Sequence, residues 1–340
     1  GVVFVGQTGE ALGRVSLAGD VNGDGLSDLL LGTINSGNLG SPGRAYVIYG
    51  QSSGMDHNFY VDPTLNPSQG MVLTGNGDSG GARQIGWFPS SAGDFNGDGY
   101  ADMIFPSAEH DDAYIIFGGP TSLLSEDVSS STLGDAGYGP GGDLDSLVAM
   151  GRGIKLHGDT YRIGFKVHGL GDVNGDGLSD VALVSNAGST SYNVRVVYGT
   201  NANIKNIILT STASTQGFRI NSDAADSGLM EVSSAGDMNG DGLADMLVAG
   251  RKFGDNLPDW AYVVYGSSNA SNLTLTNLTI AANRGFRLQG TALGNGHSTA
   301  GDLNGDGLSD LIFGNDDTGK YSVVMGGTQW VTGAVNGAGA

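Results

Sequence analysis

The chain has 340 residues with 35 acidic and 15 basic side chains, a formal net charge of −20 and no cysteine. This length supports a large buried core, and the lack of a basic stripe makes nucleic acid an unexpected partner. No apolar run approaches the ~18 residues of a membrane span, so membrane insertion is not expected. The chain starts at Gly1 with neither Met nor a signal peptide, and we therefore expect a monomeric domain within a larger chain.

The first repeat predicts four short strands separated by turns. These are residues 14–18, 29–31, 45–49 and 71–73, with polar and glycine-rich segments between them. Of the 340 residues 61 are glycine, which is far above the usual ~7%. Because no collagen period is present, this excess belongs in turns.

Later repeats restate these strands. The second strand recurs at 103–105, 181–183, 246–248 and 311–313, the third at 114–117, 194–198, 262–265 and 322–325, and the fourth at 154–156, 218–220 and 286–288. Strands two and three are nearly continuous apolar runs, so both faces of each must be covered. Sheets stacked radially, each against two neighbours, provide that cover.

Between the first and second strands of every repeat lies the pattern D-x-N-G-D-G-x-x-D, which occurs five times without a departure. Side-chain oxygens at places 1, 3, 5 and 9 can surround one ion if the chain turns sharply, and the glycine at place 6 permits that turn. Place 7 offers its backbone carbonyl, as in an EF-hand-type loop. Three carboxylates and an amide are hard oxygen ligands, so the predicted ion is Ca²⁺ rather than Mg²⁺ or Zn²⁺.

Five Ca²⁺ sites are therefore predicted. Their ligands are Asp20, Asn22, Asp24, Leu26 and Asp28; Asp94, Asn96, Asp98, Tyr100 and Asp102; Asp172, Asn174, Asp176, Leu178 and Asp180; Asp237, Asn239, Asp241, Leu243 and Asp245; and Asp302, Asn304, Asp306, Leu308 and Asp310. A surface turn that binds nothing is the alternative for a single copy, but such a turn needs only one or two of these residues. Five bound ions would bring the net charge of −20 to about −10.

The spacing of the five loops along the chain indicates the architecture. Their first aspartates stand at 20, 94, 172, 237 and 302, so that successive loops are 74, 78, 65 and 65 residues apart. Repeats longer than ~50 residues suit a four-stranded propeller blade better than a helical solenoid. We predict an all-β fold: a five-bladed β-propeller of four-stranded antiparallel blades, forming one domain over residues 1–340.

The predicted repeats span about residues 7–75, 76–158, 159–221, 222–289 and 290–330. The last repeat lacks a convincing fourth strand, whereas residues 1–6 match residues 70–75 near the end of the first repeat. We expect residues 1–6 to supply the missing strand and to close the ring, because closure removes two exposed strand edges.

Three kinds of sequence element carry a family resemblance. They are Leu-Gly at 12–13 and Ile-Gly at 85–86 and 163–164, the calcium nonapeptides, and the aromatic-Gly pairs at 49–50, 117–118, 198–199 and 265–266. With these elements, essentially the whole chain resembles the FG-GAP repeats of the integrin α-subunit propeller and of bacterial surface proteins. The resemblance implies a calcium-stabilised propeller of an extracellular adhesion or recognition protein, with calcium in all five loops.

Two departures limit what the resemblance implies. Integrin propellers have seven blades, whereas five are counted here, and the "GAP" element has decayed in every repeat. The integrin ligand and partner chain are therefore not carried over. The absence of cysteine, taken with the resemblance, favours a bacterial adhesin. Extracellular calcium modules bind with dissociation constants near ~10⁻⁴–10⁻³ M and would be empty in cytosol, so we expect a cell-surface or secreted location.

Antiparallel strands alternate in direction, so the calcium loops share one face with the connections from strand three to strand four. The opposite face is left for a ligand. Its loops hold aromatic and basic residues suited to a sugar or peptide site, namely Arg83, His110, Tyr161, Arg162, Lys252 and Trp260. For any one of these residues, the alternative is that it merely caps the end of a blade.

Recognition of an extracellular glycan or peptide is the predicted function, and a calcium-stiffened spacer of a large surface protein is the alternative. An enzyme is not expected. The five histidines are scattered, no Gly-x-Ser-x-Gly elbow follows a strand and opens a helix, and the acidic residues concentrate in the metal loops. A propeller-fold hydrolase or lyase is the less favoured alternative.

Overall fold

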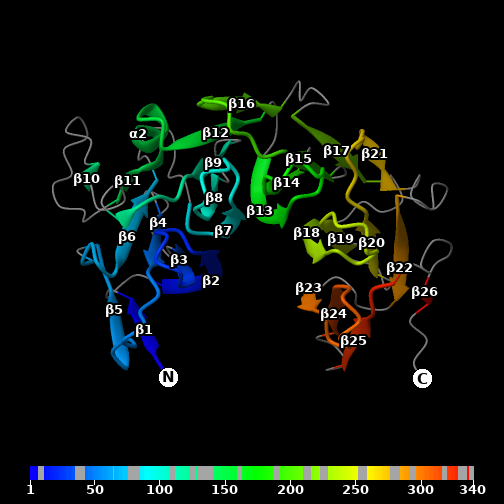
Figure 1. Ribbon diagram of the computed structural model, residues 1–340, viewed down its shortest axis with the longest axis horizontal. Coiled ribbons are helices and arrows are strands. Elements are labelled where there is room, and N and C mark those ends of the chain that lie inside the picture. Colours follow the sequence, from blue (N-terminus) through cyan, green and yellow to red (C-terminus); the bar gives the residue numbers. More distant parts are fainter. Residues whose placement is uncertain are drawn as a thin grey trace. The chain divides into compact units, whose positions relative to one another are not determined.

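The chain is an all-β protein with five blade-like sheets, and the predicted β-propeller fold class is confirmed (Figure 1). The computed structural model describes residues 1–6, 11–34, 43–63, 65–75, 85–107, 112–121, 127–128, 141–158, 163–186, 192–209, 216–222, 229–251, 259–275, 284–290, 296–315, 320–327 and 335–336. Within these residues, no helix is long and apolar enough to cross a membrane.

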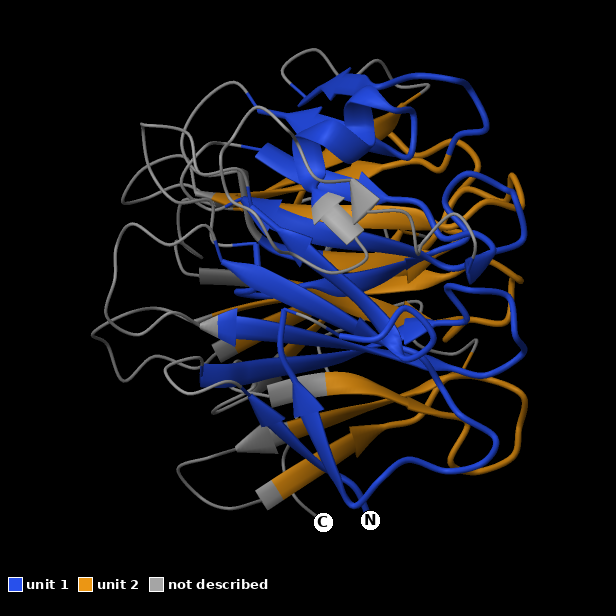
Figure 2. Cartoon of the chain, turned by 90° about the vertical axis from the view of Figure 1, so that its left-hand side faces the viewer, with its two compact units in different colours: residues 1–167, 200–210 blue, residues 168–199, 211–340 orange. Residues whose placement is uncertain are grey.

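Two compact units make up the chain (Figure 2). The first contains residues 1–167 and 200–210, and the second contains residues 168–199 and 211–340. The first unit holds the first two blades, and the second holds the third blade, apart from its first residues, together with the fourth and fifth. One domain over residues 1–340, as the repeats indicate, stays a prediction.

Both blades of the first unit have four antiparallel strands in the predicted order. Blade one contains β2 (Ala11–Gly19), β3 (Asp28–Ile34), β4 (Arg44–Ile48) and β6 (Gly70–Thr74). Blade two contains β7 (Ser90–Gly93), β8 (Asp102–Ser107), β9 (Asp112–Ile116) and β12 (Gly153–His157). The helix α2 (Leu144–Ala149) precedes β12 and begins at the N-cap Asp143, whose side chain accepts the Ser146 N–H.

The second unit repeats this plan. Blade three contains β13 (Ile163–Gly171), β14 (Asp180–Asn186), β15 (Tyr192–Val197) and β17 (Gly217–Asn221). Blade four contains β18 (Leu229–Gly236), β19 (Asp245–Arg251), β20 (Asp259–Val264) and β22 (Gly285–Gly290). The fifth sheet has three described strands, β23 (Gly296–Gly301), β24 (Asp310–Asn315) and β25 (Lys320–Val324).

Short extra strands add parallel pairings that the repeat pattern does not predict. They are β5 (Asn58–Val61), β10 (Asp127–Val128), β11 (Gly141–Asp143), β16 (Asn206–Ile208), β21 (Leu273–Thr274) and β26 (Val335–Asn336). The fourth strands β6, β12, β17 and β22 pair in parallel with β11, β16, β21 and β26, respectively. Each of these partners follows the third strand of the next repeat.

The N-terminal strand β1 (Val3–Gly6) belongs to the same series. It pairs in parallel with β5, which follows the third strand of the first repeat. The Phe4 and Phe59 rings lie 5.7 Å apart across this pair. β1 therefore takes a partner of the kind that fourth strands take, as expected for the missing fourth strand. Its pairing with the fifth sheet stays a prediction.

Strands two and three of the first four blades are largely buried on both faces, as their apolar runs predict. The prediction is wrong for β25, the third strand of the fifth sheet, where Tyr321 is 75% and Val323 42% exposed. All five residues of β9 are buried, and so are all six of β8. In the first unit, Leu30 and Val47 of blade one share a core cluster with Met103 and Phe105 of blade two. In the second unit, blades three and four share one such cluster, and blades four and five share another.

Candidate functional site

All five acidic loops connect the first and second strands of their sheets and are described in full. In the first loop, Gly23 and Gly25 have φ angles of 76° and 86°, which side chains with a Cβ rarely adopt. The glycines at places 4 and 6 of the other four loops also have positive φ. The sharp turn that the sequence predicts is therefore present in every loop.

Backbone N–H groups hold the first aspartate of each loop. Asp20 Oδ1 accepts from the N–H groups of Gly23 and Asp24 at 2.8 and 3.0 Å, and its Oδ2 accepts from Gly25 at 2.8 Å. The same three bonds hold Asp94, Asp172, Asp237 and Asp302. At Asp302 these bonds lower the pKa of the carboxyl group.

Places 3 and 5 are fixed in the same way. Asn22 Oδ1 accepts the Asp24 N–H at 2.9 Å, and Asp24 Oδ1 accepts the Leu26 N–H at 2.8 Å. The Asn22 amide also donates to Asp24 Oδ2 at 3.1 Å. All three bonds recur in the other four loops. The five loops thus share one hydrogen-bond network as well as one sequence.

The ninth aspartate has a structural role that the sequence pattern does not reveal. Asp180 is fully buried, and its two oxygens accept the N–H groups of Val173 and Gly199, each at 2.8 Å. Gly199 lies just beyond the third strand, so this carboxylate ties the loop to a residue distant in sequence. Asp28, Asp102, Asp245 and Asp310 make the equivalent pair of bonds.

We call the five ninth-place aspartates the clamp carboxylates, and burial raises the pKa of four of them. It raises the pKa of Asp28 to about 6 and the pKa of Asp102, Asp180 and Asp245 to about 7. The backbone N–H donors act in the opposite direction but are outweighed by desolvation. A cation beside such a carboxylate would favour its ionised form.

Neighbouring loops within each unit are joined directly. The Ala101 N–H donates to Asp20 O at 3.0 Å, and the Gly119 N–H donates to Val21 O at 2.9 Å. In the second unit, the equivalent bonds run from Ala244 to Asp172, Ser267 to Val173, Ser309 to Asp237 and Gly327 to Met238. A disturbance of one loop therefore reaches the next blade.

The seventh residue of a loop also covers the preceding loop. A Cβ placed on Gly23 would lie 2.4 Å from Cε1 of Tyr100, the seventh residue of the second loop. Leu243 and Leu308 cover Gly175 and Gly240 in the same way, with Cδ2 at 3.0 Å. The side chain at place 7 thus packs the blades together, a role additional to the predicted role of its carbonyl.

The chemistry of the loops fits a hard cation. Within the described residues, no three Asp, Glu or His side chains lie close enough together to hold a metal ion by themselves. An ion in the first loop would therefore also need the Asn22 amide oxygen and the Leu26 carbonyl, beside Asp20 and Asp24. Ca²⁺ accepts this mixed oxygen set. Each Asp28 oxygen accepts one N–H and keeps a second lone pair.

The residues predicted to bind a ligand are mostly outside the described part of the chain. Arg83, His110, Tyr161, Arg162 and Lys252 all fall there. Trp260 is described and is only 3% exposed. Its ring meets Tyr262 edge-on at 5.3 Å within the core of the second unit. Trp260 is therefore a core residue, with almost no surface left for a ligand.

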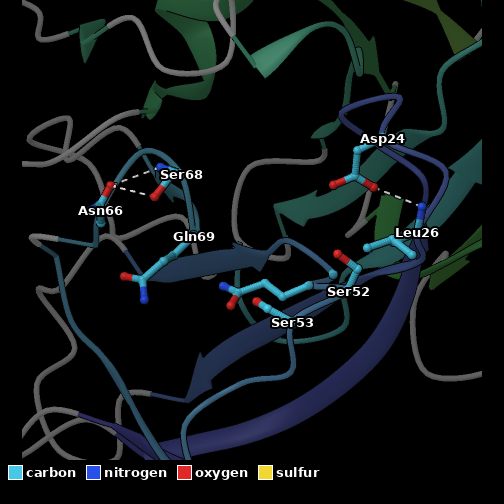
Figure 3. A pocket seen from close by; sticks show the side chains of 9 residues that line it. Asp24, Leu26, Ser52, Ser53, Asn66, Ser68 and Gln69 are labelled. Carbon is cyan, nitrogen blue, oxygen red and sulfur yellow. Dashed lines mark hydrogen bonds between the residues drawn. The ribbon is translucent and has the colours of Figure 1, made fainter.

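A polar pocket opens beside the first acidic loop (Figure 3). It has a volume of about 550 Å³ and is lined by Asp24, Leu26, Gly50, Gln51, Ser52, Ser53, Asn66, Ser68 and Gln69. All of these residues belong to the first unit. They come from the loop between β2 and β3 and from the connection between β4 and β6. The sequence suggested no ligand site here.

A charged cluster lies in blade two, at the end of the sheet opposite its acidic loop. Asp112, whose side chain is 4% exposed, contacts Lys155 Nζ at 2.9 Å and also the His157 ring. Lys155 also approaches Asp145 of α2 at 3.5 Å, and the Tyr114 hydroxyl donates to Asp145 at 2.9 Å. The cluster thus neutralises a buried carboxylate and ties α2 to the sheet, a structural role.

Comparison of the chain with models of known protein families and with curated proteins finds no match.

Proposed function

We propose that this chain is a calcium-stabilised extracellular recognition module of the FG-GAP-like propeller type. One observation carries the proposal: five loops of identical oxygen pattern share one hydrogen-bond network that fixes the side chains at places 1, 3 and 5. A surface turn without a ligand has no need for the same acidic side chains in five copies.

Calcium in these loops would act on stability. An ion that binds only the folded chain stabilises it by mass action. Here each loop is also tied to the third strand of its own blade and, within a unit, to the next blade. Ion binding would thus hold in place the contacts between blades, which suits a rigid platform for recognition outside the cell.

The ligand that we propose is a glycan or peptide bound on the face opposite the calcium loops. Arg83, Arg162 and Lys252 would bring positive charge to a chain of net charge −20, and so favour an acidic sugar or a peptide carboxylate. The second candidate is a calcium-stiffened spacer, and the density of loop-to-blade hydrogen bonds favours it equally.

A glycan and peptide array probed with the purified chain separates the two candidates. We expect calcium-dependent binding to acidic glycans or to carboxylate-bearing peptides, and weaker binding by Arg162→Ala and Lys252→Ala. Lys205→Ala provides the control, since Lys205 bonds the Ala149 carbonyl at 2.5 Å elsewhere in the first unit. An array without any calcium-dependent signal would leave the spacer as the function.

A further inference from the structure

The pocket beside the first acidic loop has walls of hydroxyl and amide groups. Asn66 Oδ1 accepts both the N–H and the hydroxyl of Ser68 at 3.0 Å, which fixes the Asn66 side chain and points its NH₂ group away from this turn (Figure 3). Within the described part of the chain, the side chains of Gln51, Ser52 and Gln69 make no hydrogen bond. These groups can therefore bond a ligand without breaking a hydrogen bond to another described residue.

Charge and shape restrict the class of ligand. Asp24 is the only charged residue of the lining, and no Lys, Arg or His is among the lining residues. An anionic ligand would thus find no partner there and would be repelled by Asp24. The lining contains no aromatic ring, and Leu26 is its only large apolar side chain, so aromatic and hydrophobic ligands would lose more than they gain.

A cationic ligand would find Asp24 as its only charged partner, and both oxygens of that carboxylate already accept a hydrogen bond within the loop. The lining therefore favours a neutral molecule rich in hydroxyl groups. The volume of about 550 Å³ lies within the ~300–1,000 Å³ usual for small-molecule sites. Sugar hydroxyls both donate and accept, and so match the mixture of amide and hydroxyl groups on the walls. We propose that this pocket binds a neutral saccharide, with Gln51, Ser52 and Gln69 bonding its hydroxyls and Leu26 contacting its C–H face.

The pocket shares Asp24 and Leu26 with the first acidic loop. The Asp24 carboxylate is held from both sides, by the Leu26 N–H on Oδ1 and the Asn22 amide on Oδ2. One side of the pocket therefore keeps its shape only while the loop keeps its fold. This inference rests on the proposed function only in one respect: if Ca²⁺ holds the first loop in shape, the affinity for the saccharide rises when Ca²⁺ is present. The polar side chains from the connection between β4 and β6 do not need the ion.

Saturation-transfer NMR on the full chain tests the proposal with the methyl glycosides of glucose, galactose, mannose and N-acetylglucosamine. We expect at least one glycoside to bind, and Gln69→Ala and Ser52→Ala each to weaken it by about 3- to 10-fold, the effect of losing one hydrogen bond. Ser268→Ala is the matched control, because Ser268 is exposed just after the third strand of blade four. It leaves the affinity unchanged.

Two results would overturn the proposal: no transfer to any of the four glycosides, or binding that survives both Gln69→Ala and Ser52→Ala. Repeating the titration in EDTA separates this site from the proposed function. Binding that persists in EDTA and responds to Gln69→Ala supports the pocket without calcium. Binding of acidic glycans that responds to Arg162→Ala and not to Gln69→Ala supports recognition on the other face, and the pocket is then decided by the four neutral glycosides alone.

Discussion

Removing one clamp carboxylate should destabilise the chain even when no calcium is present. Asp180 is fully buried and accepts the N–H groups of Val173 and Gly199 at 2.8 Å. Asp180→Ala leaves two buried N–H groups without a partner, and each such group costs about 1–3 kcal/mol. The free energy of unfolding should thus fall by about 2–6 kcal/mol.

The lower part of that range is the better expectation. Burial raises the pKa of Asp180 to about 7, so the native chain already bears a cost for keeping this carboxylate ionised. Replacing Asp180 by alanine removes that cost together with the hydrogen bonds. Asp180→Asn keeps one acceptor oxygen and should lose about half as much stability as Asp180→Ala.

Urea unfolding in EDTA, followed by circular dichroism, measures this effect. Asp176→Ala is the matched control, since Asp176 lies in the same loop but is exposed. When its carboxylate is removed, the Leu178 N–H can donate to a water molecule instead. In EDTA we expect a large loss for Asp180→Ala and a small loss for Asp176→Ala. In calcium both variants should lose the contribution of one ion. Equal midpoints for Asp180→Ala and the unaltered chain in EDTA would refute the clamp.

Three further predictions concern packing and closure. Gly23→Ala should lower the free energy of unfolding by about 1–3 kcal/mol more than Gly25→Ala. Both glycines have positive φ, but only Gly23 is covered by the Tyr100 ring, so equal melting temperatures of the two variants would contradict that contact. Trp260→Ala should cost about 3–5 kcal/mol in thermal unfolding as a core truncation, whereas an unchanged melting temperature would place Trp260 at the surface. Deleting residues 1–6 removes the partner of β5 and should cause aggregation or domain swapping in size-exclusion chromatography; a monomer of undiminished stability would show that β1 is not the latch.

The fold class was predictable because the sequence patterns that indicate it are local and recur in each repeat. The apolar runs of strands two and three predict burial on both faces, and every residue of β8 and β9 is buried. The interval between loops predicts the blade, and the four strands of blade one appear in the predicted order. The parallel strands β5 and β16 were missed, because they have only four and three residues and no counterpart in the four-strand pattern of the repeat, and their partners lie in another repeat.

The sharp bend of each acidic loop was predictable from the sequence, whereas the hydrogen bonds that tie the loop to other strands were not. The glycines at places 4 and 6 announce the bend, which the φ angles of Gly23 and Gly25 confirm. The clamp role of Asp28 depends on Gly50, which is 22 residues away, and this partner follows only once the third strand lies beside the second. Trp260 was misplaced because an aromatic residue beside a loop looks the same whether its ring points outward or into the core.

The number of Ca²⁺ ions bound per chain tests the central claim most directly. Native mass spectrometry of the full chain, titrated with Ca²⁺ and compared with an EDTA-treated sample, gives that number. The five identical loop networks predict five ions for the unaltered chain and four for Asp24→Ala, which removes one ligand of the first loop. Fewer than five ions for the unaltered chain would contradict the equivalence of the loops, and two or fewer would contradict calcium as their ligand.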